Sequence, residues 1–154
     1  MNIFVLDKDP KKSARILCDQ HVVKMILESA QLLCTAHHCT NPKSKAPYKK
    51  THVNHPCSIW TRTSEGNYNW LVAHADELCK EYTKRYNREH KTKKVIEWCK
   101  TKIPKLEKKR RTSFVQAMPE KYKNIDSFKA YEDYYKGEKL KFARWKRGKP
   151  EQFK

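Results

Sequence analysis

Apolar side chains that recur every three or four residues over long stretches of the chain constrain its fold most strongly. The first stretch follows Asp9-Pro10, an N-cap with proline at the first helical position. It predicts a helix of roughly seven turns that ends near residue 36. The same spacing predicts three more helices, over about 64–86, 93–102 and 126–145. Residues 40–50 and the lysine-rich stretch 100–111 are expected to be loops.

Two further features of the sequence limit the architecture. The chain has 154 residues, the size of one ordinary domain, and only three glycines, which argues against a tightly turned β-protein. The apolar run 2–6 fits either a short strand or an extended arm. We therefore expect one mostly α-helical domain over residues 1–154, a bundle of roughly four helices with long loops.

The charge of the chain is large and uneven. Lysine and arginine number 35 against 17 aspartate and glutamate, a formal net charge of +18. Residues 1–77 hold ten basic and seven acidic side chains (+3), and residues 78–154 hold 25 and ten (+15). A one-sided basic surface attracts a polyanion, so we predict a nucleic-acid-binding protein. No helix-turn-helix, zinc-finger or RRM pattern is present, so base reading in the major groove is not expected.

The cysteines and the lack of export signals predict the compartment. The chain has six cysteines, no signal-peptide pattern at its start and no apolar run long enough to span a membrane. We expect an intracellular, reducing location (host cytoplasm or nucleus if the protein is viral), with no membrane partner and no obligate protein partner. Cys18, Cys34 and Cys79 fall on apolar helical positions and are expected in the core.

One ridge of the first predicted helix is polar although the helix is otherwise apolar. His21, Lys24, Glu28 and Gln31 share this ridge. A helix so apolar is largely buried, and a buried carboxylate without a partner has a raised pKa. Glu28 is therefore either a structural ion-pair partner of Lys24, one turn earlier, or a catalytic carboxylate that His21 orients.

Histidines and cysteines also raise the question of a metal site. Four ligands drawn from them would suffice for zinc, but there is no Cys-x-x-Cys pair, and His52-x-x-His55 supplies only half a site. We expect no metal and no cofactor, and histidines that form hydrogen bonds or contact phosphate instead. The candidate zinc ligands are Cys18, His21, His37, His38, Cys39, His52, His55 and Cys57.

Basic residues that flank the first helix, the stretch 100–111 and the aromatic-rich C-terminal segment are expected to contact nucleic acid. Lysines and arginines bind phosphates, and aromatic rings that the core does not need can stack on bases. The predicted DNA-contacting residues are Lys11, Lys12, Arg15, Lys105, Lys108, Lys109, Arg110, Arg111, Lys139, Arg144, Trp145, Lys146 and Arg147.

The motif Cys18-Asp19-Gln20-His21, with Glu28 seven residues after the histidine, resembles a motif of the phage pyrimidine-dimer DNA glycosylases of the endonuclease V type. In that family an Asp-Gln-His opens the first long helix, and a catalytic glutamate follows at the same interval. The family also ends in a cluster of Trp, Tyr and Lys, similar here to Tyr134-Tyr135-Lys136-Gly137 and the Trp145 region. The whole chain also resembles small phage- and virus-encoded proteins.

This resemblance implies an all-α fold and a two-step reaction at damaged or modified pyrimidines in DNA. The chain's own α-amine, here that of Met1, attacks the deoxyribose C1′ and displaces the base, and the resulting Schiff base allows β-elimination of the 3′ phosphate. Glu28 acts as the general acid and base, with His21 and Lys24 completing the site. An α-amine is neutral at pH 7 far more often than a lysine, which favours the terminus as nucleophile.

The chain departs from the family's pattern around the terminus. Its nucleophile would be the Met1 amine rather than that of a small hydroxylated residue, because the bulky Asn2 favours retention of the initiator methionine. The family has basic residues beside its terminus and one turn from the glutamate, where this chain has the uncharged Ile3, Leu27 and Gln31. Basic side chains that could substitute are Lys8, Lys11, Lys12 and Arg15.

The sequence favours a DNA glycosylase with AP-lyase activity, acting on duplex DNA in preference to a single strand. It leaves two alternatives open. One is a non-catalytic nucleic-acid-binding protein, in which Glu28 only pairs with Lys24. The other is a metal-dependent nuclease that uses His52, His55 and Glu28.

Overall fold

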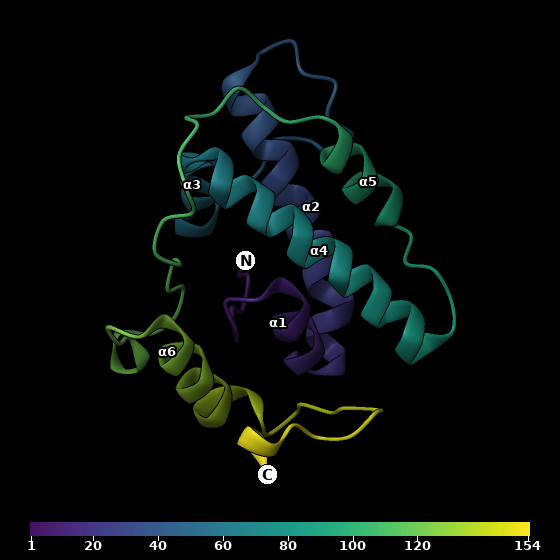
Figure 1. Ribbon diagram of the computed structural model, residues 1–154, viewed down its shortest axis with the longest axis vertical. Coiled ribbons are helices and arrows are strands. Elements are labelled where there is room, and N and C mark those ends of the chain that lie inside the picture. Colours follow the sequence, from purple (N-terminus) through teal and green to yellow (C-terminus); the bar gives the residue numbers. More distant parts are fainter.

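The computed structural model describes all 154 residues. It contains six α-helices, joined by loops and turns, and no β-strand. The two longest, α2 (Asp19–Thr40) and α4 (Glu65–Tyr86), lie side by side at the centre of the molecule (Figure 1). Around them lie α1 (Pro10–Ile16), α3 (Pro56–Thr63), α5 (Lys93–Thr101) and α6 (Ser127–Tyr134). Short turns complete the chain: η1 (Glu120–Tyr122), the π-helical η2 (Tyr135–Lys139) and η3 (Glu151–Phe153). The predicted mostly α-helical fold is confirmed, with more helices than expected.

The core lies where α2 and α4 face each other. Leu33 of α2 and Leu71 and Leu78 of α4 are completely buried in it. Burial of one leucine side chain contributes about 1.5–3 kcal/mol, so this shared stripe holds the two helices together. The predicted helices 64–86 and 93–102 correspond closely to α4 and α5.

The predicted first helix is wrong in one respect, because it is two helices. The chain leaves the helical conformation at Leu17 and Cys18, where ψ is 138° and 163°. The carbonyl groups freed at this break are taken by distant side chains: Arg85 donates to the Leu17 oxygen at 2.8 Å, and the Trp145 indole donates to the Ile16 oxygen at 2.8 Å. A spacing rule cannot anticipate partners that lie so far along the chain.

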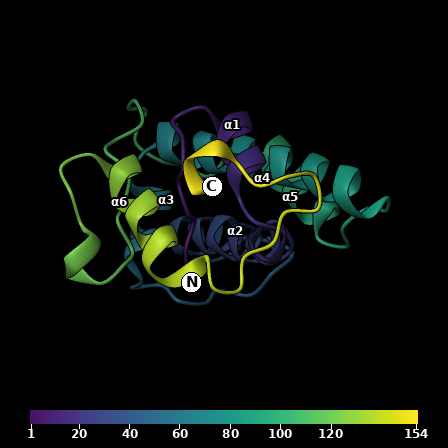
Figure 2. The same cartoon turned by 90° about the horizontal axis from the view of Figure 1, so that it is seen from below.

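The predicted last helix is also too long. It begins as expected, with Asp126 accepting from the Phe128 and Lys129 amides, but α6 ends at Tyr134 and widens into η2. Residues 142–146 are not helical (Figure 2 shows the C-terminal segment crossing α1 and α2), because their backbone bonds to Asp19 and Gln20. The eight-residue α3 was not predicted, since so short a segment shows little periodicity.

The run 2–6 is an extended arm rather than a strand. All five of its residues are buried, from Asn2 at 7% exposure to Ile3 and Val5 at 0%. The arm is fixed to α1 because the Leu6 amide donates to the Ser13 hydroxyl at 3.1 Å. It therefore carries the start of the chain through the core to the side of α2.

No helix combines the length and hydropathy needed to cross a bilayer.

Candidate active site

The start of the chain meets the buried carboxylate of α2. The Met1 amine lies 3.4 Å from Glu28 Oε1, and the Asn2 amide donates to the same oxygen at 3.0 Å. Glu28 is only 6% exposed. On its other side, Lys24 Nζ lies 3.9 Å from Oε2, on a side chain that is 70% exposed. Glu28 therefore has the predicted lysine neighbour and, in addition, a partner that its position in the helix did not reveal.

The buried side chain of Asn2 fixes the direction of the arm. Its Oδ1 accepts from the amides of Ile3 and Phe4 at 2.7 and 3.1 Å, and its Nδ2 donates to the Ala117 carbonyl at 2.7 Å. The Tyr131 hydroxyl lies 3.3 Å from the same Oδ1. Both ends of the amide are thus satisfied, which holds the first residues of the chain in one orientation.

Phe4 turns the arm by adopting a left-handed backbone, with φ at +58°. Its ring stacks on His21, with 4.1 Å between centroids and 13° between planes. A bulky residue in this region costs about 1–2 kcal/mol, so the surrounding contacts must hold it there. The residues that position the amine, Asn2, Phe4 and Tyr131, were not identified from the sequence. The one signal in the sequence that could have pointed to them is Asn2, a polar residue at the start of the apolar run 2–6.

His21 does not hydrogen-bond to Glu28. Its Nδ1 forms a short hydrogen bond with the Tyr135 hydroxyl, and its ring is covered by Phe4. Burial lowers the pKa of His21 to about 3, with the nearby charge of Lys139 adding to the effect. His21 is thus a neutral imidazole about 10 Å from Glu28 along the helix, and it contacts the arm through the ring of Phe4.

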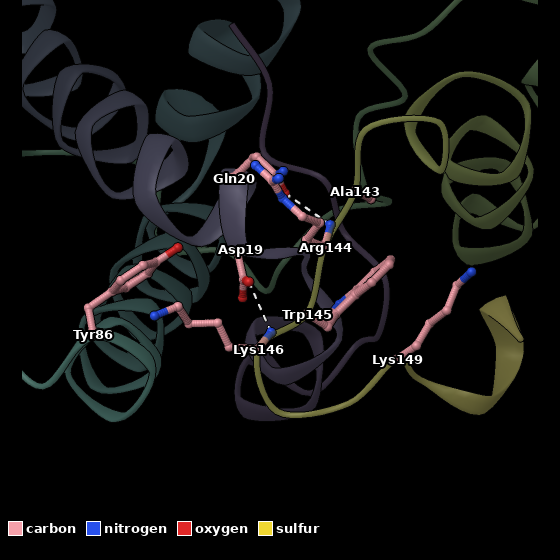
Figure 3. A pocket seen from close by; sticks show the side chains of 8 residues that line it. All are labelled: Asp19, Gln20, Tyr86, Ala143, Arg144, Trp145, Lys146 and Lys149. Atoms are coloured by element: carbon pink, nitrogen blue, oxygen red, sulfur yellow. Dashed lines mark hydrogen bonds between the residues drawn. The ribbon is translucent and has the colours of Figure 1, made fainter.

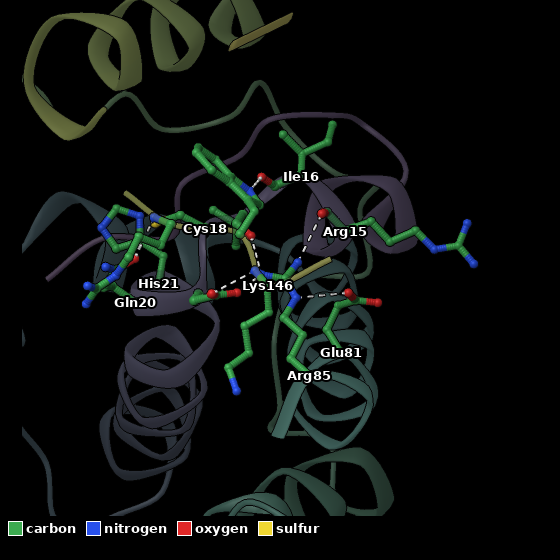
Figure 4. Close-up of polar contacts among 12 residues, drawn as sticks. Arg15, Ile16, Cys18, Gln20, His21, Glu81, Arg85 and Lys146 are labelled. Atoms are coloured by element: carbon green, nitrogen blue, oxygen red, sulfur yellow. Dashed lines mark hydrogen bonds and ion pairs between the residues drawn. The ribbon is translucent and has the colours of Figure 1, made fainter. Parts of the chain in front are cut away.

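Asp19 and Gln20, the other residues of the Asp-Gln-His motif, hold the C-terminal segment against α2 (Figures 3 and 4). Asp19 pairs with Arg85 at 3.0 Å and accepts from the Lys146 amide at 2.9 Å. Gln20 donates to the Phe142 carbonyl at 2.7 Å and accepts from the Arg144 amide at 3.1 Å. The motif therefore has a structural role, because it joins the start of α2 to the C-terminal segment.

The start of α3 lies beside the same site. His55 caps this helix by accepting from the Cys57 amide at 3.0 Å, and it is within electrostatic reach of the Met1 amine and Glu28. Burial lowers the pKa of His55, and the positive charge of the amine lowers it further. Burial raises the pKa of the Cys57 thiol to about 12, so this cysteine stays protonated.

The histidines and cysteines do not assemble into a metal site. No group of three or more His, Cys, Asp or Glu side chains is arranged to hold a metal ion. His52 is exposed and bonds to the neighbouring Thr51 hydroxyl, so His52, His55 and Glu28 do not form the centre that a metal-dependent nuclease would need. All six cysteines are free, and the predicted core positions Cys18, Cys34 and Cys79 are confirmed as buried.

Residues 1–94, more than half of the chain, match the family model for pyrimidine dimer DNA glycosylases. The chain belongs to this family. Family membership supports DNA glycosylase activity on pyrimidine dimers, a role in DNA repair and DNA as the substrate. No curated protein and no solved structure matches the chain.

The part that matches the glycosylase family contains the arm, Glu28 and Arg85, but not the C-terminal segment that packs on α2. In this glycosylase that segment borders a cavity of about 600 Å³, in which Lys146 Nζ lies 4.8 Å from the Tyr86 ring centroid (Figure 3). Predicted DNA-contacting residues Arg144, Trp145 and Lys146 line it. Trp145 is partly used by the fold, because its ring stacks on Phe153.

The other predicted DNA-contacting residues of the glycosylase are distributed over its surface. Lys11, Lys12 and Arg15 are exposed on α1, and Arg147 is exposed near the C-terminus. Lys139 is half-buried, with Nζ 4.9 Å from the Tyr134 ring centroid.

The remaining predicted contacts form a basic loop, residues 105–111, that is bound to the start of α4. The Glu65 amide donates to the Glu107 carbonyl at 2.8 Å, and the Gly66 amide donates to the Lys109 carbonyl at 3.0 Å. The charged side chains of the basic loop are exposed, namely Lys105, Lys108, Lys109, Arg110 and Arg111. Lys109 pairs with Glu107 at 2.9 Å and Arg111 donates to the Thr112 carbonyl at 2.9 Å, whereas Lys105, Lys108 and Arg110 have no ion pair. A fixed backbone with exposed cationic side chains suits phosphate contacts.

Proposed function

We propose that this family member removes damaged pyrimidines from duplex DNA and then cleaves the strand, with the Met1 amine as nucleophile and Glu28 as general acid and base. The observation that carries the proposal is the 3.4 Å separation between the Met1 amine and Glu28 Oε1. Twenty-six residues separate the two in the sequence, and only the buried arm brings them together.

The chemistry follows from these two groups. The neutral amine attacks C1′ of the damaged nucleotide: the N–C1′ bond forms, and the bond to the base breaks with its electron pair leaving on the base, which water protonates. The attacking nitrogen then gives one proton to the Glu28 carboxylate. The C1′–O4′ bond then opens to a Schiff base, and Glu28 supplies a proton to O4′. The resulting carboxylate removes a proton from C2′, and the C3′–O3′ bond breaks to release the 3′ phosphate.

Lys24 supplies the positive charge at this site. The residues next to Glu28 where the family has basic side chains are uncharged here, and Lys24 Nζ lies 3.9 Å from Oε2. Its side chain is exposed, so it can contact a DNA phosphate while it remains near the carboxylate. The basic side chains on α1, Lys11, Lys12 and Arg15, form no ion pair with Glu28.

A borohydride trapping experiment tests the proposal. Reduction during reaction with duplex DNA that contains a pyrimidine dimer should give a covalent protein–DNA adduct, because the Schiff base becomes a stable amine. Peptide mapping should place the DNA on Met1. Acetylation of the amine should abolish both the adduct and strand cleavage. An adduct on a lysine would reject the terminal nucleophile, and binding without any adduct would favour the non-catalytic alternative.

A further inference from the structure

A second cavity, of about 620 Å³, lies between the ends of α2 and α5, away from the Met1–Glu28 pair. In Figure 1 the two chain segments that leave these helices approach each other near one end of the molecule. Each segment contributes two lysines to the lining: Lys43 and Lys45 after α2, and Lys102 and Lys105 after α5. Of these, only Lys105 was expected to contact DNA.

The charge in this cavity is not compensated by the protein. All four lysines are exposed, none forms an ion pair, and no carboxylate lines the cavity. Residues 29–64 contain no aspartate or glutamate at all. A helix C-terminus carries about half a negative charge, so the ends of α2 and α5 together offset roughly one of the four lysine charges. The cavity therefore keeps a strong positive potential.

Two neutral side chains in the lining have hydrogen-bond donors to spare. Asn41 Oδ1 accepts from the Lys43 amide at 3.0 Å, which leaves the Asn41 NH₂ group without a protein acceptor. The Ser44 hydroxyl accepts from the Ala46 amide at 3.2 Å, and its own hydrogen has no protein acceptor either. The backbone thus holds the oxygens of both side chains and leaves their hydrogens for a ligand.

We propose that this cavity, which we call the lysine pocket, binds a phosphate group. The pocket offers several ammonium groups and neutral hydrogen-bond donors, and no carboxylate lines it. Such a lining suits an anion with three or four oxygens. The phosphate can belong to a DNA backbone, which rests on the function proposed above, or can be a free phosphate ion. The two sources are distinguished by the experiments below.

Helix α2 fixes the distance between the lysine pocket and Glu28. His37 and Thr40 at the end of α2 line the pocket, nine to twelve residues after Glu28. At 1.5 Å per residue this is about 14–18 Å along the helix, or roughly four to five base pairs of a duplex that runs parallel to α2.

Equilibrium binding of an undamaged duplex tests the pocket without any need for catalysis, so inactivity of the Met1–Glu28 pair would not affect the result. The double variant Lys43→Ala/Lys45→Ala should flatten the dependence of log affinity on log salt by about 1.8, because each lost phosphate contact contributes about 0.9. Lys43→Arg/Lys45→Arg should retain the steep slope. The control Lys80→Ala/Lys84→Ala removes the same charge at positions that are already ion-paired on α4, and it should change the slope little.

The source of the phosphate is decided by two further measurements. If the backbone supplies it, a neutral methylphosphonate four or five base pairs from the lesion position should weaken binding by the native protein but not by Lys43→Ala/Lys45→Ala. If free phosphate is the ligand, inorganic phosphate should saturably shift the amide resonances of residues 41–45 in the native protein only, and the methylphosphonate should have no effect. An unchanged salt slope together with no phosphate-dependent shifts would overturn the proposal.

Discussion

The phenyl ring of Phe4 lies nearly parallel to the imidazole of His21, with 4.1 Å between their centroids. This contact joins the N-terminal arm to α2, and His21 is held in turn by the Tyr135 hydroxyl. Met1 lies only three residues before Phe4, so the stack limits where the amine can lie relative to Glu28. We regard Phe4 as a positioning residue for the proposed reaction.

Phe4→Leu should therefore slow strand cleavage while DNA affinity stays unchanged. Leucine keeps the arm apolar but loses the ring stack, and a displacement of about 1 Å at a reacting centre can lower a rate by up to about 10². Single-turnover cleavage and duplex binding would be measured together. Phe128→Leu, which alters a half-buried ring on α6, is the control. A loss of stability with an unchanged cleavage rate would show that the stack is only structural.

Glu28→Gln should keep the fold and the DNA affinity but lower strand cleavage by about 10² or more, because glutamine cannot transfer a proton. Glu120→Gln, at an exposed ion pair with Lys123, is the matched control and should retain full activity. If Glu28 were only the structural partner of Lys24, the variant would cleave at the normal rate and would differ from the native protein only in its free energy of unfolding.

The stability of the protein should depend on pH through His74. This residue of α4 is completely buried, and neither ring nitrogen has a hydrogen-bond partner. Burial lowers its pKa to about 3, so below pH 6.5 the unfolded chain binds a proton that the folded protein does not. The free energy of unfolding should therefore fall by about 1.4 kcal/mol per pH unit from this group as pH decreases from 6.5 towards 3.

Urea unfolding at pH 6.5, 5.5 and 4.5 measures this dependence. His74→Phe keeps an aromatic ring against Trp70, which lies 4.9 Å from the imidazole centroid, and removes the titrating group. The free energy of unfolding of this variant should depend on pH less steeply than that of the native protein, by about 1.4 kcal/mol per pH unit, the contribution of one proton. Parallel slopes would contradict a buried neutral His74.

The basic loop, residues 105–111, should supply phosphate contacts. If about six such contacts form across the protein, log affinity for duplex DNA should fall with log salt at a slope near −5. Replacement of the four consecutive cations 108–111 by alanine should flatten this slope. A slope that does not change would mean that DNA lies on another face.

Gly66→Ala tests whether the position of this basic loop matters, because it removes no charge. A Cβ atom at Gly66 would lie 2.3 Å from the Arg111 backbone nitrogen and 2.6 Å from the Arg110 carbonyl carbon, so the loop must move. DNA affinity should decrease, and trypsin should cleave within the loop faster than in the native protein. Normal affinity despite faster cleavage would show that the fixed loop conformation is unnecessary for binding.

The sequence alone determined the elements that depend on neighbouring residues. Helical spacing predicted α4 and α5, and Asp9 and Asp126 were correctly identified as N-caps. Glu28 stood out as a carboxylate in an apolar helix. These features follow from contacts between residues three or four positions apart, which any sequence displays directly.

Tertiary structure alone decided how the site is assembled. The break between α1 and α2 depends on Arg85 and Trp145. The place of the Met1 amine depends on Asn2, whose side chain also bonds to Ala117 and Tyr131, more than 110 residues away. These side chains satisfy backbone groups that a continuous helix would have satisfied internally. Because such contacts replace local hydrogen bonds with distant ones, they leave no periodic signal, and only the folded chain shows that its first residue meets Glu28.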